Sequence, residues 1–258
     1  MIKEVRAKSI LNRSSIGDYV INPYVGCQHA CIYCYAQFYA RRWGRTEAWG
    51  SYIEVKVNAP ELLAKEVRRK REGVVYLSSM TDPYQPVERE YELTRRLLEI
   101  LVERDWPVLV QTKSPLVLRD IDVLRRFSQV RVGMTIVTLG EEVRRVMEPR
   151  APSVDGRIQA LEELKERGIG TFAFIGPILP GTSVEEVLEL VRALRGKADV
   201  AYFDRLNMKP GLRPKLDTAM RKLGVKDWDS DLDSYYRRLK ARLTKELRSV
   251  GVRYVFVY

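Results

Sequence analysis

Short apolar runs alternate with longer stretches of mixed polarity along most of the chain. The runs are rich in Val, Ile, Tyr and Phe and are bounded by turn-forming residues, which is typical of buried strands. At least six of them are found, at residues 19–26, 74–79, 108–112, 130–137, 171–175 and 199–206. Between them, apolar residues recur at helical spacing, as at residues 35–43, 90–104, 141–147 and 157–167. This alternation predicts right-handed βαβ units and a parallel sheet, either doubly wound or curved towards a barrel.

Turn and capping residues predict where several helices begin and end. Pro60 opens a stretch with acidic residues early and basic residues late, which predicts a helix that stops at Gly73. The Ser-Pro pair at residues 114–115 marks another helix start. Ser183 and Glu186 have the spacing of a capping box, in which each side chain bonds the other residue's backbone N–H.

The two ends of the chain differ from the repeating pattern. Residues 1–18 are polar and hold turn-forming residues, so we interpret them as a lead-in to the first strand. Near the other end, a basic helix carries leucines at i, i+4 spacing, namely Leu239, Leu243 and Leu247. This stripe is typical of core packing, and residues 252–257 are expected to form a final apolar strand.

A chain of 258 residues is long enough for one large domain, and α/β barrels commonly fill this length. We therefore expect a single domain over residues 1–258, with a core at about 15–206 and a C-terminal extension at about 207–258. The apolar fraction of 45% and the charged fraction of 31% are typical of a soluble globular protein. Because no apolar run approaches the ~18 residues of a membrane span and the start lacks a secretory apolar region, we expect a cytoplasmic protein without a membrane partner.

The charge balance favours an anionic partner. Lys and Arg number 45 against 34 Asp and Glu, a formal charge of +11, which suits nucleic acid or an anionic substrate. Interleaved charges at residues 65–72 and 237–248 are equally typical of the ion-pair-rich surface of a thermophilic protein. Charge alone therefore leaves both interpretations open.

All three cysteines lie in one segment, NPYVGCQHACIYCYAQFYARRW, at residues 22–43. Cys27, Cys31 and Cys34 have the spacing C-x3-C-x2-C, and a set of thiolate ligands selects iron–sulfur clusters, zinc or copper(I). An odd count at such short spacing disfavours disulfides and indicates a metal or redox site in a reducing compartment. His29, the only histidine, would complete a Cys3His zinc site, although its place between the first two cysteines makes joint coordination awkward.

The segment CQHACIYC, followed by a βα-repeat chain, resembles the radical S-adenosylmethionine (SAM) superfamily. Several further motifs resemble its spore photoproduct lyase-like subgroup, namely NPYVGCQHACIYCYA, TDPYQPVE, TKSPLVLRDIDVL, EPRAPSVDGRIQALEELKERGI and GPILPG. The resemblance extends roughly over residues 9–206. It implies a partial (β/α)6 TIM-type barrel, here followed by a C-terminal helix and strand extension, with the active site at the carboxyl ends of the strands.

The same resemblance implies the cofactors. A [4Fe–4S] cluster would be held by Cys27, Cys31 and Cys34, and its fourth iron would be chelated by SAM. Reductive cleavage of SAM would then give methionine and a 5′-deoxyadenosyl radical that abstracts hydrogen from the substrate. The electron would come from an external donor such as ferredoxin or flavodoxin.

Four SAM-binding residues are expected close to the cysteines or after the second and third strands. Tyr33 matches the family position beside the adenine. Thr81 and Asp82 are expected to meet the SAM amino group, and the alternative is a simple Thr-Asp turn before a proline. Lys113 resembles the lysine that pairs with the SAM carboxylate, and the alternative is a solvated surface lysine.

The other expected cofactor-binding residues follow later strands or lie in the EPR…R and GPILPG motifs. They are Thr135, Thr138, Glu148, Arg157, Ile175 and Pro177. The resemblance implies that the two threonines meet the ribose, that the acid and guanidinium bind ribose hydroxyl and carboxylate, and that the last two belong to the adenine wall. The alternative for the two threonines is ordinary β-propensity, and the alternative for the acid and guanidinium is a structural ion pair. For the last two residues the alternative is Gly-Pro turn chemistry.

The cysteine count also separates this chain from its nearest analogy. Spore photoproduct lyase uses an additional cysteine as a hydrogen donor. This chain has no cysteine left over for that role, and none for an auxiliary cluster. A tyrosine such as Tyr24, Tyr35 or Tyr84 is an alternative donor.

The sequence therefore favours a radical SAM enzyme that acts on a nucleic-acid base or nucleotide, as a lesion lyase or a modification enzyme. Basic residues near the tail support this substrate class, namely Arg205, Lys209, Arg213 and Lys215. Two alternatives stay open. One is radical SAM chemistry on a peptide or small metabolite, and the other is a non-catalytic zinc-binding interaction module.

Overall fold

One curved sheet of eight strands dominates the structure, a computed structural model that describes residues 1–258. The strands lie in the order β11-β10-β9-β8-β7-β6-β3-β2. Their bounds are β2 Asn12–Arg13, β3 Tyr19–Ile21, β6 Val75–Leu77, β7 Val108–Thr112, β8 Val130–Thr135, β9 Gly170–Ile178, β10 Val200–Arg205 and β11 Arg253–Phe256. All neighbours pair in parallel except β2 and β3, which are antiparallel.

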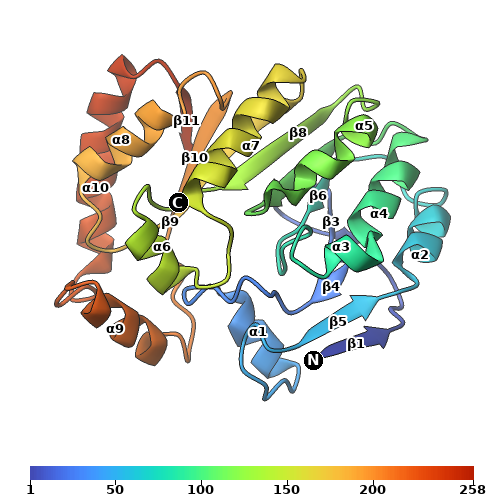
Figure 1. Cartoon of the computed structure of the whole chain (residues 1–258), viewed down its shortest axis with the longest axis horizontal. Helices are drawn as coiled ribbons and strands as arrows, with labels where there is room; N and C mark the ends of the chain where they lie inside the picture. Colours follow the sequence, from blue (N-terminus) through green and yellow to red (C-terminus); the bar gives the residue numbers. More distant parts are fainter.

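The strand order matches the predicted βα winding. From β3 to β10 each strand lies beside the previous strand of the same sheet, with helices on the outside of the curve (Figure 1). Because β2 and β11 remain unpaired edges, the barrel is partial and does not close. The predicted partial barrel of parallel strands is confirmed, with a strand in each of the six predicted segments.

The helices pack apolar stripes against the sheet. Their bounds are α1 Ala36–Arg42, α2 Ala59–Glu66, α3 Glu88–Tyr91, α4 Leu93–Val102, η1 Pro115–Asp120, α5 Ile121–Leu124, α6 Glu141–Met147, α7 Val154–Glu166, α8 Val184–Ala193, α9 Arg213–Lys222, α10 Leu232–Glu246 and η2 Leu247–Ser249. In α4, for example, Leu97, Leu98 and Leu101 are all buried, at the spacing of one helix face. At the start of α8 the predicted capping box is present: Ser183 Oγ accepts from the Glu186 N–H at 3.1 Å, and the Glu186 carboxylate accepts from the Ser183 N–H at 2.7 Å.

Two predicted helix boundaries are wrong for identifiable reasons. The helix expected at residues 90–104 is divided into α3 and α4 at Glu92, whose φ is +49°. The buried carboxylate of Glu88 accepts from the Thr94 N–H at 3.0 Å, so it caps α4 and stabilises the break. The helix opened by Pro60 ends at Glu66, well before Gly73, and α9 was not expected from the pattern.

A second sheet, which the sequence did not predict, lies beside α1 (Figure 1). It has three strands in the order β1 Ile2–Val5, β5 Ile53–Lys56 and β4 Tyr24–Val25. The interpretation of residues 1–18 as a polar lead-in is therefore wrong. β1 is an exposed edge strand whose side chains carry no alternation of burial, so backbone pairing with β5 alone defines it. The third strand of this sheet, β4, pairs antiparallel with β5 and comes from the predicted first strand, which breaks after Ile21.

The C-terminal extension adds a strand to the barrel sheet. The leucines of the predicted stripe are all buried, and β11 pairs in parallel with β10. The predicted C-terminal helix and strand are thus present, and they cover one edge of the core. No helix of the structure combines the length and apolar character needed to cross a membrane.

We expect truncation of this stripe to destabilise the fold. Leu243 is completely buried, so Leu243→Ala should lower the free energy of unfolding by about 2–5 kcal/mol. Leu139→Ala removes the same atoms from a side chain that is 39% exposed and should cost no more than about 0.5 kcal/mol. Urea unfolding followed by circular dichroism measures both. Equal costs for the two variants would contradict the assignment of α10 to the core.

Candidate functional site

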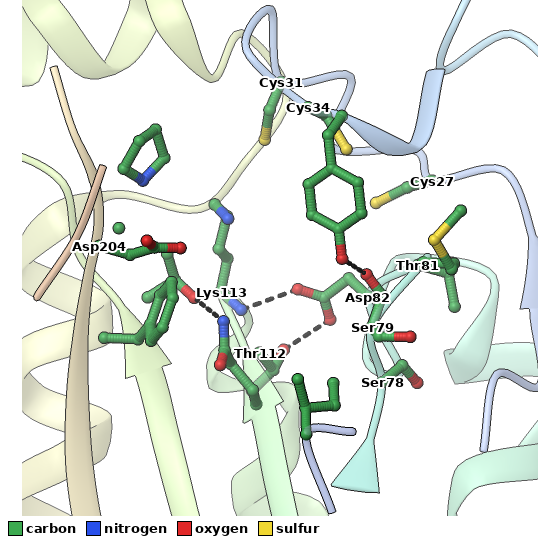
Figure 2. A pocket seen from close by; sticks show the side chains of 18 of the residues that line it. Cys27, Cys31, Cys34, Ser78, Ser79, Thr81, Asp82, Thr112, Lys113 and Asp204 are labelled. Atoms are coloured by element: carbon green, nitrogen blue, oxygen red, sulfur yellow. Dashed lines mark hydrogen bonds between the residues drawn. The ribbon is translucent and has the colours of Figure 1, made fainter. Parts of the chain in front are cut away.

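A cavity of about 560 Å³ lies inside the barrel and extends from the carboxyl ends of the strands towards their amino ends, where Arg131 lines it. The cysteine segment covers one end of it, and strands β6 to β10 supply the walls. Figure 2 shows the three cysteines above the cavity, with Asp82, Thr112 and Lys113 below them. The cavity therefore lies where the βα architecture concentrates functional side chains.

The three thiols line this cavity together. Cys27 and Cys31 are buried, and Cys34 is half-buried. Burial raises the pKa of all three thiols, that of Cys31 to about 12. Without a cationic centre, thiolates here would be costly, whereas metal coordination deprotonates such thiols. The donor set thus fits a thiolate-bound metal cluster.

The spacing of the thiols bears on the choice between a cluster and a single ion. No three His, Cys, Asp or Glu side chains converge on one point as the ligands of a single metal ion do. A tetrahedral zinc ion brings all its ligands to about 2.0–2.3 Å of one atom. In an iron–sulfur cluster each cysteine binds a different iron, so its thiols do not have to meet at a single atom.

The cysteine segment is held by contacts with the end of β6. Gly26 has φ +87°, and a Cβ there would come within 2.4 Å of the Tyr52 carbonyl oxygen, so the turn before Cys27 requires glycine. The Thr81 hydroxyl donates to the Gly26 carbonyl at 2.5 Å. The buried Gln85 donates to Thr81 Oγ1 at 2.9 Å and accepts from the Gln28 N–H at 2.8 Å. The TDPYQ motif therefore positions the loop.

His29 is buried in the same cavity and has no hydrogen-bond partner on either ring nitrogen. Its Nε2 lies 3.9 Å from Asp82 Oδ2. Burial lowers the pKa of His29 below its ordinary value, which favours the neutral ring. The residue is therefore available to a ligand in the cavity.

Asp82 and Lys113 lie next to each other on the cavity floor. The Asp82 carboxylate accepts from the Thr112 hydroxyl at 2.6 Å, the Lys113 N–H at 2.8 Å and the Tyr84 N–H at 2.9 Å. It joins the ends of β6 and β7. Burial acts against the charge of Lys113, but Cys31 and Glu148 outweigh it and raise the pKa of the ammonium group.

Behind the cavity, Glu148 and Arg157 form a fully buried ion pair at 2.6 Å. The Tyr33 hydroxyl donates to Glu148, and Lys113 Nζ lies 3.8 Å from the same carboxylate. Burial alone would raise the pKa of Glu148, but Arg157 and Lys113 lower it. Arg157 also donates to the Thr135 carbonyl at 3.0 Å. The pair connects α6, α7, β8 and the cysteine segment.

The structure brings most of the sequence-predicted residues to one place. Those that line the cavity are Cys27, Cys31, Cys34, Tyr33, Thr81, Asp82, Lys113, Thr135 and Pro177. Glu148 and Arg157 contact this set from behind. Thr138 and Ile175 instead line a separate cavity of about 380 Å³ beside α8.

The three tyrosines suggested as hydrogen donors lie in different parts of the structure. The Tyr35 ring lines the main cavity, and its hydroxyl donates to the Ser79 carbonyl at 2.6 Å. Tyr24 and Tyr84 are buried elsewhere, where their hydroxyls donate to Glu88 and Asp120. Only Tyr35 of the three borders the space that a substrate would occupy.

Sequence reasoning missed the half of the cavity farther from the cysteines. Its walls are residues from β6 to β10 whose side chains point into the barrel, namely Tyr76, Gln111, Arg131, Phe172, Phe174, Tyr202 and Asp204. Phe172 and Phe174, like Tyr202 and Asp204, are two positions apart and therefore face the same side of their strand. The signal in the sequence that could have indicated this half of the cavity is Asp204, an acidic residue within the apolar run at residues 199–206.

Comparisons with known proteins agree on the family. The family model described as the radical SAM superfamily matches residues 21–194. An uncharacterized protein of Methanocaldococcus jannaschii is 39% identical over 210 residues, 81% of this chain and 78% of that protein. A radical SAM Nalpha-GlyT isomerase of Pseudomonas phage M6 is 29% identical over 161 residues, 62% of this chain and 33% of the isomerase.

Among solved structures, spore photoproduct lyase complexed with dinucleoside spore photoproduct has a TM-score of 0.77. The match covers 100% of this chain and 82% of the lyase chain, at 17% identity. The likeness therefore concerns the fold, and it includes the C-terminal extension.

We expect loss of the Glu148 charge to destabilise the protein in a pH-dependent way. Glu148→Gln leaves Arg157 buried without its counter-ion and should lower the free energy of unfolding by about 3–5 kcal/mol. The exposed pair of Glu163 and Arg167, at 3.6 Å, supplies the control, and Glu163→Gln should cost no more than about 1 kcal/mol.

The pH dependence follows from the lowered pKa of Glu148. Its stabilising contribution is complete above the ordinary carboxyl pKa of 4.5 and is lost as the pH falls through the folded-state value. The difference in unfolding free energy between wild type and Glu148→Gln should therefore shrink below about pH 4.5. Urea unfolding at several pH values measures it, and a difference that stays constant would contradict an ionised Glu148.

Proposed function

The chain belongs to the radical SAM superfamily, and from this premise we propose that it directs radical chemistry at a nucleic-acid base or nucleotide. Its cofactors are those of the family, a [4Fe–4S] cluster and SAM. The observation that carries the proposal is one cavity with three thiols at one end and a chamber of aromatic and basic side chains at the other.

We assign the cluster to Cys27, Cys31 and Cys34. When bound, the cluster and SAM supply a one-electron reductive cleavage that releases methionine and a 5′-deoxyadenosyl radical. Every thiol of the chain lies in this one site, so the electron must come from a partner, and a small reductant such as ferredoxin or flavodoxin fits that role.

The cavity floor suits the amino-acid part of SAM. Lys113 carries a charge in the cavity and can pair with the SAM carboxylate, while Glu148 orients the lysine from behind. Asp82 has one carboxylate lone pair beyond its three protein contacts for the SAM amino group. Thr81 lies beside Asp82 at the expected site of the SAM amino group, and its hydroxyl also supports the cysteine segment through the Gly26 carbonyl.

The other nominated residues are assigned by their positions. Tyr33 and Pro177 lie at the cavity surface, where a purine ring has apolar contacts, and Thr135 is the hydroxyl available to the ribose. Arg157 acts through Glu148, while Thr138 and Ile175 support the wall from the neighbouring cavity. Tyr35 is the candidate hydrogen donor, because it alone of the three suggested tyrosines borders the cavity.

A nucleic-acid substrate is supported by charge and by the relatives. The formal charge of +11 favours a polyanion, and the fold is like that of a lyase whose structure holds a dinucleoside. Aromatic walls suit flat bases, which stack on such rings. Peptide or metabolite substrates form the rival class, and two basic side chains of the cavity lining, those of Arg131 and Arg205, argue against them.

The chemistry is tested with reconstituted protein. Reduced wild type should hold about four irons with sulfide per chain and convert SAM to 5′-deoxyadenosine, measured by chromatography. Cys31→Ala should lose both the iron and the product, whereas His29→Gln should keep the iron. One zinc per chain, lost in His29→Gln, would instead indicate the zinc-binding module. An intact cluster that yields no 5′-deoxyadenosine would contradict the enzyme.

The substrate class is tested by binding to DNA and RNA oligonucleotides at several salt concentrations. Affinity should be greatest at low salt and fall with a slope set by the number of phosphate contacts. Lys209, two residues beyond the cavity-lining Asn207, is a phosphate contact candidate. Lys209→Gln should reduce the slope by about 1, while Arg167→Gln, on the outer helix α7, should not. Absence of affinity at low salt would contradict a nucleic-acid substrate.

A further inference from the structure

The chamber farther from the cysteines contains one carboxylate with unused acceptor capacity, that of Asp204. Figure 2 shows this side chain across the cavity from Cys27 and Thr81. Its Oδ1 accepts only from the Arg205 N–H, at 2.8 Å. The Arg205 guanidinium pairs with the exposed Asp233 instead, at 2.9 Å. Burial raises the pKa of Asp204, as expected of a carboxylate with too few donors around it.

The neighbouring polar groups are already satisfied. Gln111 accepts from the Tyr76 hydroxyl and donates to Thr135 Oγ1 at 3.1 Å, so both ends of its amide are engaged. Asp82 accepts three protein hydrogen bonds. Asp204 is therefore the carboxylate in the chamber farther from the cysteines that a ligand can use without displacing a protein contact.

Three aromatic side chains, those of Phe172, Phe174 and Tyr202, line the same cavity as Asp204. Phe172 and Tyr202 contact each other edge to face, with ring centroids 5.6 Å apart. A Cβ at Gly133 would lie 2.0 Å from the Phe172 ring, and one at Gly176 would lie 2.2 Å from the Phe174 ring. Because these two glycines lack side chains, the Phe172 and Phe174 rings fit directly against the backbone there.

The charges of the lining favour a neutral ring over a cationic side chain. The lining holds three basic side chains, Lys113, Arg131 and Arg205, and two carboxylates, Asp82 and Asp204. A lysine or arginine of a peptide would meet this net positive surface. A nucleobase on an anionic backbone would instead meet the free Asp204 carboxylate at its edge and the basic side chains of the lining around it.

We propose that Asp204 accepts hydrogen bonds from the N–H groups on the pairing edge of a nucleobase, while the rings of Phe172, Phe174 and Tyr202 contact its faces. Extruded bases are read in this way in other enzymes, by edge hydrogen bonds and aromatic stacking. The inference rests on the proposed function and names the residue that selects the base.

The test uses cluster-loaded protein with SAM present and measures nucleoside binding by calorimetry. Two pairs of probes are compared, thymidine with N3-methylthymidine and guanosine with N1-methylguanosine, because methylation removes the N–H and keeps the ring. Wild type should prefer the unmethylated member of a pair about tenfold or more. In Asp204→Ala the preference should fall to about one, while Asp155→Asn, at the exposed start of α7, should keep it.

Iron content and the unfolding midpoint check that Asp204→Ala is intact, and Asp204→Leu repeats the test with a side chain of similar size that has no hydrogen-bond acceptor. If wild type discriminates within a pair and both variants discriminate equally well, the role of Asp204 is wrong and the proposed substrate class stands. If wild type binds no nucleoside but binds the peptide Gly-Lys-Gly through Asp204, the nucleobase assignment is wrong, whereas SAM cleavage still reports on the radical chemistry.

Discussion

The arrangement of the site depends on a carboxylate that is completely removed from solvent. Glu148 lies between Arg157 at 2.6 Å and Lys113 at 3.8 Å, and it accepts from the Tyr33 hydroxyl. An isolated charge at this depth would be strongly unfavourable, so the carboxylate is stable only while its partners stay in place. Those partners belong to the cysteine segment, β7 and α7. One buried charge thus fixes the position of the cysteine segment relative to the barrel.

A second set of polar contacts holds the same segment from the opposite side. Gln85 and Thr81 bind the turn at Gly26, and the Asn22 side chain accepts from the Ser79 and Met80 N–H groups at 3.1 and 2.8 Å. A loop that carries two buried thiols and one half-buried thiol cannot rely on apolar packing alone, because its backbone groups also need partners. The end of β6 supplies those partners, which explains why the TDPYQ motif and the cysteine motif belong together.

The sequence predicted those parts of the fold that repeat. Apolar runs with period-2 or helical spacing marked all six barrel segments and the capped helix α8. It failed for β1, because an exposed edge strand is defined by backbone pairing with β5 and its side chains show no alternation. The sequence also did not predict the helix break at Glu92. The buried Glu88 carboxylate caps the next helix there by accepting from the Thr94 N–H. Both features depend on contacts between segments, which local patterns do not contain.

The candidate site likewise has one part that local sequence motifs predict and one part that depends on contacts between segments. Residues of the cysteine end occur in contiguous motifs, so a resemblance could nominate them residue by residue. The opposite chamber is assembled from single positions on β6 to β10, and only the register of the parallel strands makes Phe174 and Tyr202 neighbours. Substitution at those positions leaves the cofactor end untouched and alters what the chamber accepts. A barrel built in this way can change its substrate without changing its chemistry, so the identity of the substrate is to be sought in the inward positions of the strands.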